Sequence, residues 1–328
     1  MDPFRWEDGE RLVRFGRGTV AEAGALLGDG YALLTTERAA AAAPLVAEGA
    51  GQVHLVGSGL VDELAGALLD RVQGERLVAL GGGRVIDTAK ALAAARPGRR
   101  VAAVPTTLSG AEMTRVHRHA AGVPADTPRV RPAIVLCDPA LCASQPEAEL
   151  AASALNALGH AAEGPCTPLA NPVSTLSAHR AATLIAGAFS SDDGDPDRDA
   201  LALGALLAGH AIDSARYGLH HVLAQTLVRI AGVGHALANA VMLEHTLGAL
   251  AERFPDQLWA LEAAVGEDPS ELARRLCELT GTTRLSELGV TRAALEQCAD
   301  VAAGRAELEL TPPSAAREEL LALYTAAW

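Results

Sequence analysis

Short apolar runs alternate with amphipathic segments in the first half of the chain. The runs are rich in Val, Leu, Ile and Ala, as expected of strands that are buried on both faces; they cover 13–18, 31–36, 52–58, 76–83, 101–107 and 132–138. Between several of them lie segments whose apolar residues recur at helical spacing, namely 19–28, 37–49, 60–73 and 84–95. This alternation predicts a parallel sheet covered by helices on both faces.

The pattern changes after about residue 145. Ala, Leu, Glu and Arg dominate, the Val/Ile runs disappear, and loop signals such as 190–197 and 311–313 interrupt an otherwise helical pattern. The sequence therefore predicts two domains: an α/β, Rossmann-like domain over residues 1–143 and an all-α domain over residues 144–328.

Charge and composition exclude several classes of protein. The net charge of −13 leaves no basic stripe that could neutralise nucleic-acid phosphates. No stretch has the length and apolarity of a membrane span, and the charged N-terminal segment does not have the pattern of a signal peptide. Five cysteines without a CxxC pair indicate reduced thiols. We therefore expect a cytoplasmic protein with a small-molecule ligand.

Three glycines stand between a predicted strand and a predicted helix in RLVALGGGRVIDTAKALA (76–93). Gly81, Gly82 and Gly83 allow the backbone to approach an anion closely, and the helix N-terminus favours negative charge. Asp87 and Lys90 follow in the first two turns. Lys90 is the sole lysine among 27 basic residues, which favours a need for a compact ammonium. The alternative is a tight turn without a ligand, since GGG is neither GxGxxG nor a phosphate loop.

Hydroxyl side chains follow two other predicted strands. VPTTLSGAEMT (104–114) places Thr106, Thr107 and Ser109 at a strand end, where open α/β sheets bind ligands. Thr36 ends the strand over 31–36, where an enzyme that selects NADH often has a carboxylate. Arg38 nearby favours a 2′-phosphate, whereas Glu37 could reject it. These residues predict a dinucleotide site that accepts NADPH as well as NADH.

Histidines recur in the helical half. His160 lies one turn after Asn156, His220 and His221 lie in a second helix, and His235 opens a third after a break at 230–234. A single histidine on a helix is more often an ordinary core or surface residue. Three imidazoles from three helices nevertheless suit Zn or Fe(II).

Taken in order, these segments resemble the iron-type (group III) alcohol dehydrogenase family. GGGRVIDTAKALA is similar to the family's GGGSxxDxAKxxA turn, and VPTTLSGAEMT to its PTT…SExT segment. NALGHAAEG is similar to the DAxxHxxE metal helix, and GLHHVLAQ and GVGHALANAVML to the GxxHxxxH and xPHGxxNAxxLP segments. The maleylacetate reductase branch, which tends to have Asn at the first metal position, is the nearest resemblance.

The resemblance implies an NAD(P)H-dependent oxidoreductase that reduces a small, acidic, unsaturated keto or carbonyl substrate. It assigns the catalytic region to His160, His220, His221 and His235. It assigns cofactor binding to Thr36, Gly81, Gly82, Gly83, Asp87, Lys90, Thr106, Thr107 and Ser109. It also implies a homodimer.

The same resemblance implies a weak or vestigial metal site at Asn156, His160, His221 and His235. Three imidazoles and an amide bring no charge to offset a dication, so Fe or Zn is possible but not expected to be essential. Gln225 stands where a second active-site His is common, which leaves the proton donor open. Three alternatives stay open: a metal-dependent alcohol dehydrogenase that tolerates Asn156, a dehydroquinate-synthase-like lyase or cyclase, and a non-catalytic relative.

Overall fold

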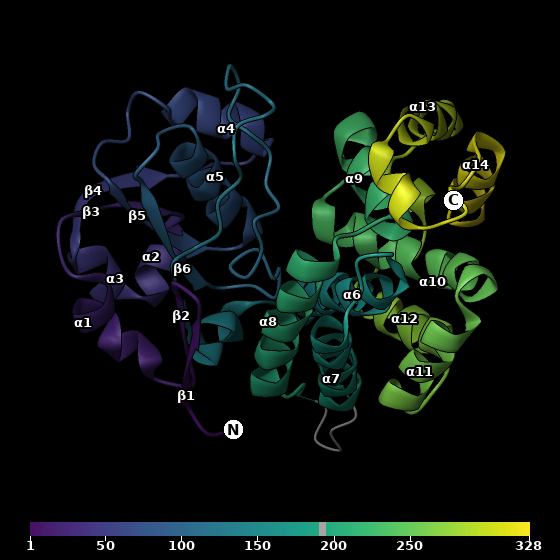
Figure 1. Cartoon of the computed structure of the whole chain (residues 1–328), viewed down its shortest axis with the longest axis horizontal. Helices are drawn as coiled ribbons and strands as arrows, with labels where there is room; N and C mark the ends of the chain where they lie inside the picture. Colours follow the sequence, from purple (N-terminus) through teal and green to yellow (C-terminus); the bar gives the residue numbers. More distant parts are fainter. Residues whose placement is uncertain (190–194) are drawn as a thin grey trace. The chain divides into compact units, whose positions relative to one another are not determined.

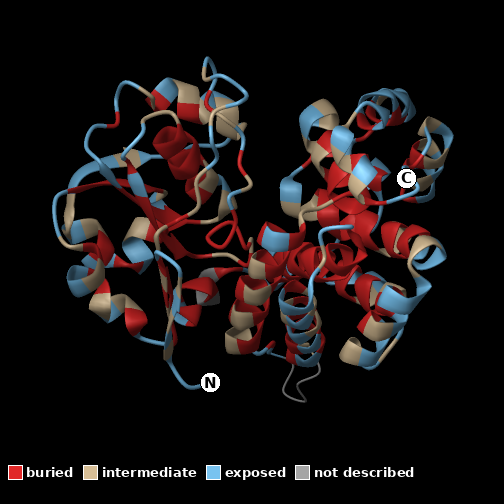
Figure 2. Ribbon diagram, viewed as in Figure 1, coloured by how far each residue is buried: buried red, intermediate tan, exposed pale blue. Residues whose placement is uncertain are grey.

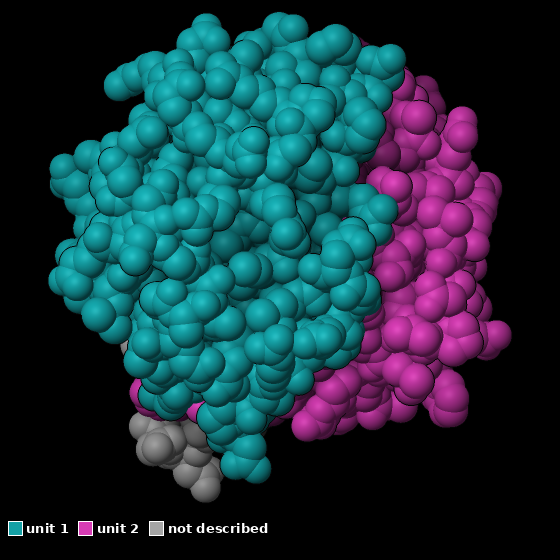
Figure 3. Space-filling model, turned by 60° about the vertical axis from the view of Figure 1, so that its left-hand side comes forward, with its two compact units in different colours: residues 1–144 teal, residues 145–328 magenta. Residues whose placement is uncertain are grey.

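The chain forms two compact units, residues Met1–Ser144 and Gln145–Trp328 (Figure 3). The structure, a computed structural model, describes residues 1–189 and 195–328. Of the loop predicted at 190–197, residues 190–194 therefore lie outside the described residues. Each unit is built around its own core and is considered by itself.

Unit 1 contains a twisted sheet that is parallel except at one edge. Its described strands are β1 (Phe4–Asp8), β2 (Arg11–Phe15), β3 (Tyr31–Thr35), β4 (Ala50–Leu55), β5 (Arg76–Gly81), β6 (Arg100–Pro105) and β7 (Ile134–Cys137). They lie in the order β1-β2-β7-β6-β5-β3-β4, and only β1 and β2 pair antiparallel. The six predicted strands are confirmed, and β1 is an additional one. Its alternating FRWED has too few apolar residues to be recognised from its pattern.

Helices cover both faces of this sheet (Figure 1). Successive residues of the central strands enter opposite cores: Leu77 and Ala79 of β5 pack in one core, whereas Val78 and Leu80 pack in the other. The first core includes α4 (Val61–Leu68) and α5 (Gly83–Ala94). The second includes α1 (Ala23–Leu27), α2 (Glu37–Ala42) and α3 (Pro44–Glu48). Burial on both faces of the sheet thus explains why the sequences of these strands are almost continuously apolar.

The strand order locates the ligand-binding edge. After β3 the chain moves outward to β4, returns to β5 on the other side of β3, and then continues to β6 and β7. This is the 2-1-3-4-5 order of flavodoxin-like sheets rather than the 3-2-1-4-5-6 order of the six-stranded Rossmann sheet. From β3 the chain continues to β4 on one side, and from β5 it continues to β6 on the other side. The topological switch point therefore lies between the carboxyl ends of the adjacent strands β3 and β5.

Unit 2 is helical in its described residues. Its α-helices are α6 (Glu147–Glu163), α7 (Pro172–Ala188), α8 (Arg198–Ala215), α9 (Leu219–Ala231), α10 (His235–Arg253), α11 (Pro255–Val265), α12 (Pro269–Glu278), α13 (Arg292–Ala303) and α14 (Arg317–Ala326). Short 3₁₀ turns lie at η1 (Thr19–Glu22) and η2 (Pro139–Ser144) in unit 1, and at η3 (Gly164–Cys166), η4 (Leu285–Leu288) and η5 (Ala306–Leu310) in unit 2. The break predicted at 230–234 is confirmed over residues 232–234, between the end of α9 and the start of α10, whereas residues 230 and 231 belong to α9.

Helix α6 forms the centre of unit 2 (Figure 2). Every residue from Leu150 to Glu163 is buried, because α7, α8, α9, α10 and α12 all pack against it. Small alanines allow these close contacts, and the helix carries Asn156 and His160 into the core. Over residues 1–189 and 195–328, no helix is long and apolar enough to cross a membrane.

Candidate active site

The predicted nucleotide segments meet at one edge of the sheet in unit 1. Strands β3, β5 and β6 run parallel and end side by side, with Thr35 opposite Leu80 and Gly81 opposite Pro105. The Thr106 amide donates to the Gly81 carbonyl (3.1 Å). The structure therefore brings Thr36, the glycine turn and the Thr106–Ser109 segment together at the switch point, as expected for a nucleotide site.

The glycine turn is closely packed against the next segment. A Cβ added at Gly82 would lie 3.0 Å from Thr107, and one at Gly83 would lie 3.0 Å from Ser109. Gly82 is the N-cap of α5 and supplies no side-chain acceptor to its first turn. The start of α5 is therefore suited to an external anion such as a pyrophosphate, and the residues present fit a dinucleotide.

Thr36 has a structural task beside its predicted contact with the cofactor. It is the N-cap of α2, and its hydroxyl accepts from the Ala39 amide (3.2 Å). A threonine cap stabilises a helix by about 1 kcal/mol. Thr36 lies at the edge of the sheet where a nucleotide would bind; its hydroxyl oxygen caps α2, and its O–H group can still donate to a ligand.

Lys90 is fully buried, and its ammonium is surrounded by oxygen atoms. It donates to the carbonyls of Ala111 (2.9 Å), Thr114 (3.0 Å) and Val116 (2.8 Å), and it pairs with Asp87 Oδ1 at 2.7 Å. A compact ammonium satisfies such converging acceptors better than a planar guanidinium does. This geometry favours a positioning role, in which Lys90 holds the 111–116 segment and orients Asp87, over direct contact with the cofactor.

Glu112 lies fully buried beside this ammonium. Burial raises the pKa of Glu112 to about 7, although the Lys90 and Arg11 charges act in the opposite direction. The folded state therefore holds the proton more tightly than the unfolded state, in which the pKa is 4.5. The resulting contribution to the free energy of unfolding is fully present below about pH 4.5 and is lost as the pH rises through about 7.

Replacing Glu112 by Gln should remove this pH dependence. We expect the free energy of unfolding of Glu112→Gln, relative to wild type, to rise by roughly 3 kcal/mol between about pH 4.5 and about pH 8. Denaturant unfolding at several pH values measures the difference. Glu75→Gln, a change at an exposed carboxylate of the same unit, is the control and should show no such trend. If the free energies of unfolding of wild type and Glu112→Gln changed with pH in the same way, the raised pKa of Glu112 would be contradicted.

In unit 2 a buried carboxylate organises the imidazoles. Glu163 ends α6 and accepts from the backbone amide of His220 (2.7 Å), so that it anchors the start of α9. Its other oxygen lies 2.8 Å from Nδ1 of His221. Because Nδ1 donates to this carboxylate, Nε2 of His221 carries the lone pair. No role for Glu163 is predicted from the sequence, although it stands three residues after His160 in an HxxE pattern.

The predicted histidines form a group, but their environments differ. The His160 and His221 rings lie 4.6 Å apart, and those of His220 and His221 lie 4.9 Å apart. His220 is fully buried, packs against Gly159 and contacts the Thr246 hydroxyl (2.8 Å), which favours a supporting role. Burial lowers the pKa of both His220 and His221 to about 3, and that of His160 well below its usual range. His235 is exposed at the start of α10 and influences the other three histidines electrostatically.

A tightly held metal ion does not fit this donor set. The His160 and His221 rings lie nearly parallel, with an interplanar angle of 15°. Asn156, buried at 3% exposure, supplies a neutral amide in place of a carboxylate. Across the described ranges, no group of three or more His, Cys, Asp or Glu is arranged to hold a metal ion. The Glu163–His221 pair is nevertheless typical of a metal ligand with an outer carboxylate.

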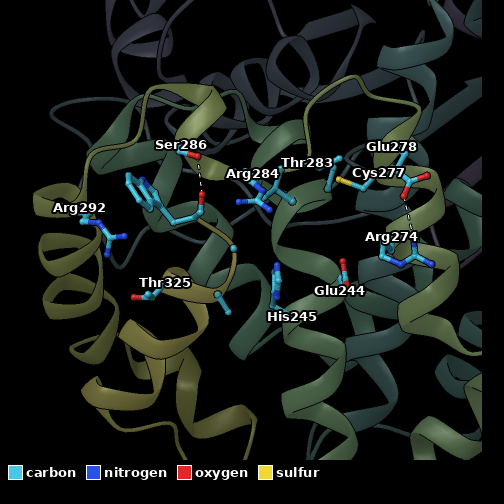
Figure 4. Close-up of a pocket in the computed structure, with 15 residues that line it drawn as sticks. Glu244, His245, Arg274, Cys277, Glu278, Thr283, Arg284, Ser286, Arg292 and Thr325 are labelled. Carbon is cyan, nitrogen blue, oxygen red and sulfur yellow. Dashed lines mark hydrogen bonds and ion pairs between the residues drawn. The ribbon is translucent and has the colours of Figure 1, made fainter.

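A separate cavity of about 610 Å³ opens in unit 2 between α10, α12 and the end of α14 (Figure 4). Arg284 and His245 project into it, and Arg292 lies over the Trp328 ring at its wall. None of the predicted site residues lines this cavity. It was not expected from the sequence, because its lining comes from segments distant along the chain.

Residues 150–328 match the sequence model of the C-terminal domain of the Fe-containing alcohol dehydrogenase family. The chain belongs to this family. Maleylacetate reductase 1 of Rhodococcus opacus is 33% identical over 251 residues, which cover 74% of this chain and 70% of that protein. The resemblance to iron-type alcohol dehydrogenases and maleylacetate reductases is confirmed.

Solved structures of iron-type alcohol dehydrogenases share the fold. The maleylacetate reductase of Agrobacterium tumefaciens superposes with a TM-score of 0.83 at 26% identity and covers 100% of this chain and 99% of that one. The iron-containing alcohol dehydrogenase of Corynebacterium glutamicum superposes with a TM-score of 0.82 at 26% identity, over 96% and 94% of the two chains. Both the predicted α/β plus all-α fold class and the assignment as an NAD(P)-dependent oxidoreductase are confirmed.

Proposed function

We propose that this family member is a reductase of the maleylacetate reductase type. It reduces a small acidic substrate that carries an unsaturated keto or carbonyl group, uses NADPH or NADH, and does not depend strictly on a metal ion. The observation that carries the proposal is the donor set of unit 2: a buried amide at Asn156 in place of a carboxylate, with no group of three or more His, Cys, Asp or Glu in the described residues arranged to hold a metal ion. The relatedness to maleylacetate reductases supports the substrate class.

The nicotinamide cofactor, when bound, supplies the hydride. The chain's residues bind and orient it. Gly81 to Gly83 and the start of α5 hold the pyrophosphate, Asp87 lies at the nicotinamide end, and Thr106, Thr107 and Ser109 serve the adenosine side. Lys90 keeps these segments in place through its carbonyl contacts. NADPH is accepted, because Thr36 stands at the end of β3 where an enzyme that selects NADH often has a carboxylate.

The histidines have different roles in the proposed reaction. His221 is held by Glu163 with its lone pair on Nε2, and its low pKa keeps it neutral, so it accepts hydrogen bonds at neutral pH. Nδ1 of His160 has no hydrogen-bond partner in the described chain. His160 is therefore the imidazole that can turn an N–H toward the substrate oxygen, where it stabilises developing negative charge. His235 is exposed to solvent at the start of α10.

Chelation tests the proposal directly. Protein purified without a chelator should oxidise NADPH in the presence of an unsaturated keto-dicarboxylate, and excess EDTA should leave the rate unchanged. Elemental analysis should find far less than one metal ion per chain. A full complement of metal together with loss of activity on chelation would favour a metal-dependent alcohol dehydrogenase, for which the Glu163–His221 pair is the structural argument. A cytoplasmic homodimer belongs to the same proposal, and sedimentation tests the assembly.

A further inference from the structure

One arginine lies beside the imidazoles of unit 2. Arg305 precedes η5, and its Nη2 donates to Oε1 of Gln225 on α9 (3.0 Å). Gln225 follows His221 by one helical turn, so the two residues share a face of α9. The Tyr217 ring centroid lies 5.7 Å from that of His221, and its hydroxyl lies 3.4 Å from Nη2 of Arg305. The guanidinium therefore lies at the edge of the imidazole group.

The three nitrogen atoms of the Arg305 guanidinium differ in the hydrogen bonds that they donate. Nε and Nη2 both donate to the carboxylate of Glu307, at 3.2 and 2.7 Å. Nη1 donates to no atom of residues 1–189 or 195–328, and the side chain keeps 18% of its surface exposed. The bonds to Glu307 and Gln225 fix the guanidinium plane, which reduces the entropy lost when a further anion binds.

The geometry points to Arg305 as the residue that binds a carboxylate of the substrate through an N–H group of Nη1. The inference rests on the proposed function for its choice of a small dicarboxylate. A chain with a net charge of −13 repels such a ligand unless a local cation attracts it. Arg305 carries a permanent positive charge beside these imidazoles.

Gln225 fits this assignment. A histidine at this position would present a ring nitrogen to the guanidinium and could itself become positively charged. The amide oxygen of Gln225 accepts from Nη2 without a charge of its own. The carboxylate of Glu307 occupies the Nε edge of the guanidinium and leaves the N–H groups of Nη1 available. The hydrogen bond with Arg305 is thus a physical reason for glutamine at position 225, where a second active-site histidine is common in the family.

Binding of maleate, a dicarboxylate without a carbonyl group to reduce, tests the inference. Calorimetry in the presence of excess NADPH compares wild type with Arg305→Gln, Arg305→Lys and the control Arg317→Gln, which removes a partly exposed arginine paired with Asp300 and Glu296. We expect maleate affinity to fall about 30-fold in Arg305→Gln and less in Arg305→Lys, and to stay unchanged in Arg317→Gln. For a reducible keto acid, Arg305→Gln should raise KM far more than it lowers kcat.

Equal maleate affinity in wild type and Arg305→Gln, or no maleate binding to wild type, would overturn the inference. Since Arg305→Gln leaves Glu307 without its partner, the double variant with Glu307→Gln is measured as well. It should unfold at the same temperature as wild type and still lack maleate affinity. If wild type binds maleate through Arg305 but oxidises no NADPH with any unsaturated keto acid, the proposed function is wrong and the anion site stands.

Discussion

Gly82→Val should weaken NAD(P)H binding by at least about 100-fold, because the new side chain occupies the space where a pyrophosphate approaches the start of α5. The backbone at Gly82 is extended, with φ of −81°, so a β-branched residue is not strained there. Its Cβ would lie 3.0 Å from Thr107, which must shift by a few tenths of an ångström. Fluorescence titration with NADPH and NADH measures the loss.

Gly24→Val provides the matched control in the same unit. A Cβ added at Gly24 meets nothing within 4 Å, and Gly24 lies in α1, away from the carboxyl ends of the strands. We expect this variant to bind NADPH like wild type. Thermal unfolding of Gly82→Val should show a loss of only about 1–2 kcal/mol. Unchanged NADPH affinity in a folded Gly82→Val protein would mean that the nucleotide binds elsewhere.

Asn156→Asp should restore a preference for metal ions. One anionic oxygen would join His160, His221 and His235, and the added charge should tighten binding of Zn or Fe(II) by about 100-fold, since α6 is shielded from water. The side chains of Asn and Asp have nearly the same shape, so the buried packing should survive. Elemental analysis after anaerobic loading and dialysis measures the gain, and we expect the variant to retain more metal than wild type.

Asn171→Asp is the control for this charge change. Asn171 is the N-cap of α7 and accepts from the Val173 and Ser174 amides, a task that Asp performs as well. It adds the same charge in unit 2 without adding a donor to the imidazoles. If Asn171→Asp gained as much metal as Asn156→Asp, the effect would be non-specific. If wild type already held a full equivalent, Asn156 would be a working ligand.

The sequence predicted the elements of the fold well, because double burial of a parallel sheet produces unmistakable apolar runs. It predicted the strands over 31–35 and 76–81 to within a few residues. It could not predict β1, whose side chains alternate between half-buried and exposed and which depends on pairing with β2 rather than on a core of its own. The order of the strands could not be predicted either. Strand β5 pairs with β3 rather than with β4, which precedes it in the sequence, and a local sequence pattern does not show this pairing.

The candidate site was predictable only where its residues are close in sequence. The glycine turn and the His160 helix could be recognised as local motifs. Arg305 lies 80 residues after Gln225, and no local pattern brings them together. Lys90 could be picked out by its uniqueness, but its neighbours were unknown because the 111–116 segment folds back over α5 through backbone carbonyls, which have no signature in the sequence.

The burial of the chain's sole lysine has a consequence for covalent chemistry. While the 111–116 segment holds the Lys90 amine, acylating reagents, carbonyl compounds that form imines, and conjugating enzymes that require a lysine find no nucleophilic side-chain amine on the folded protein. Such chemistry can begin at Lys90 only after this segment has separated from α5. A modified Lys90 would therefore be a lasting record that unit 1 had opened.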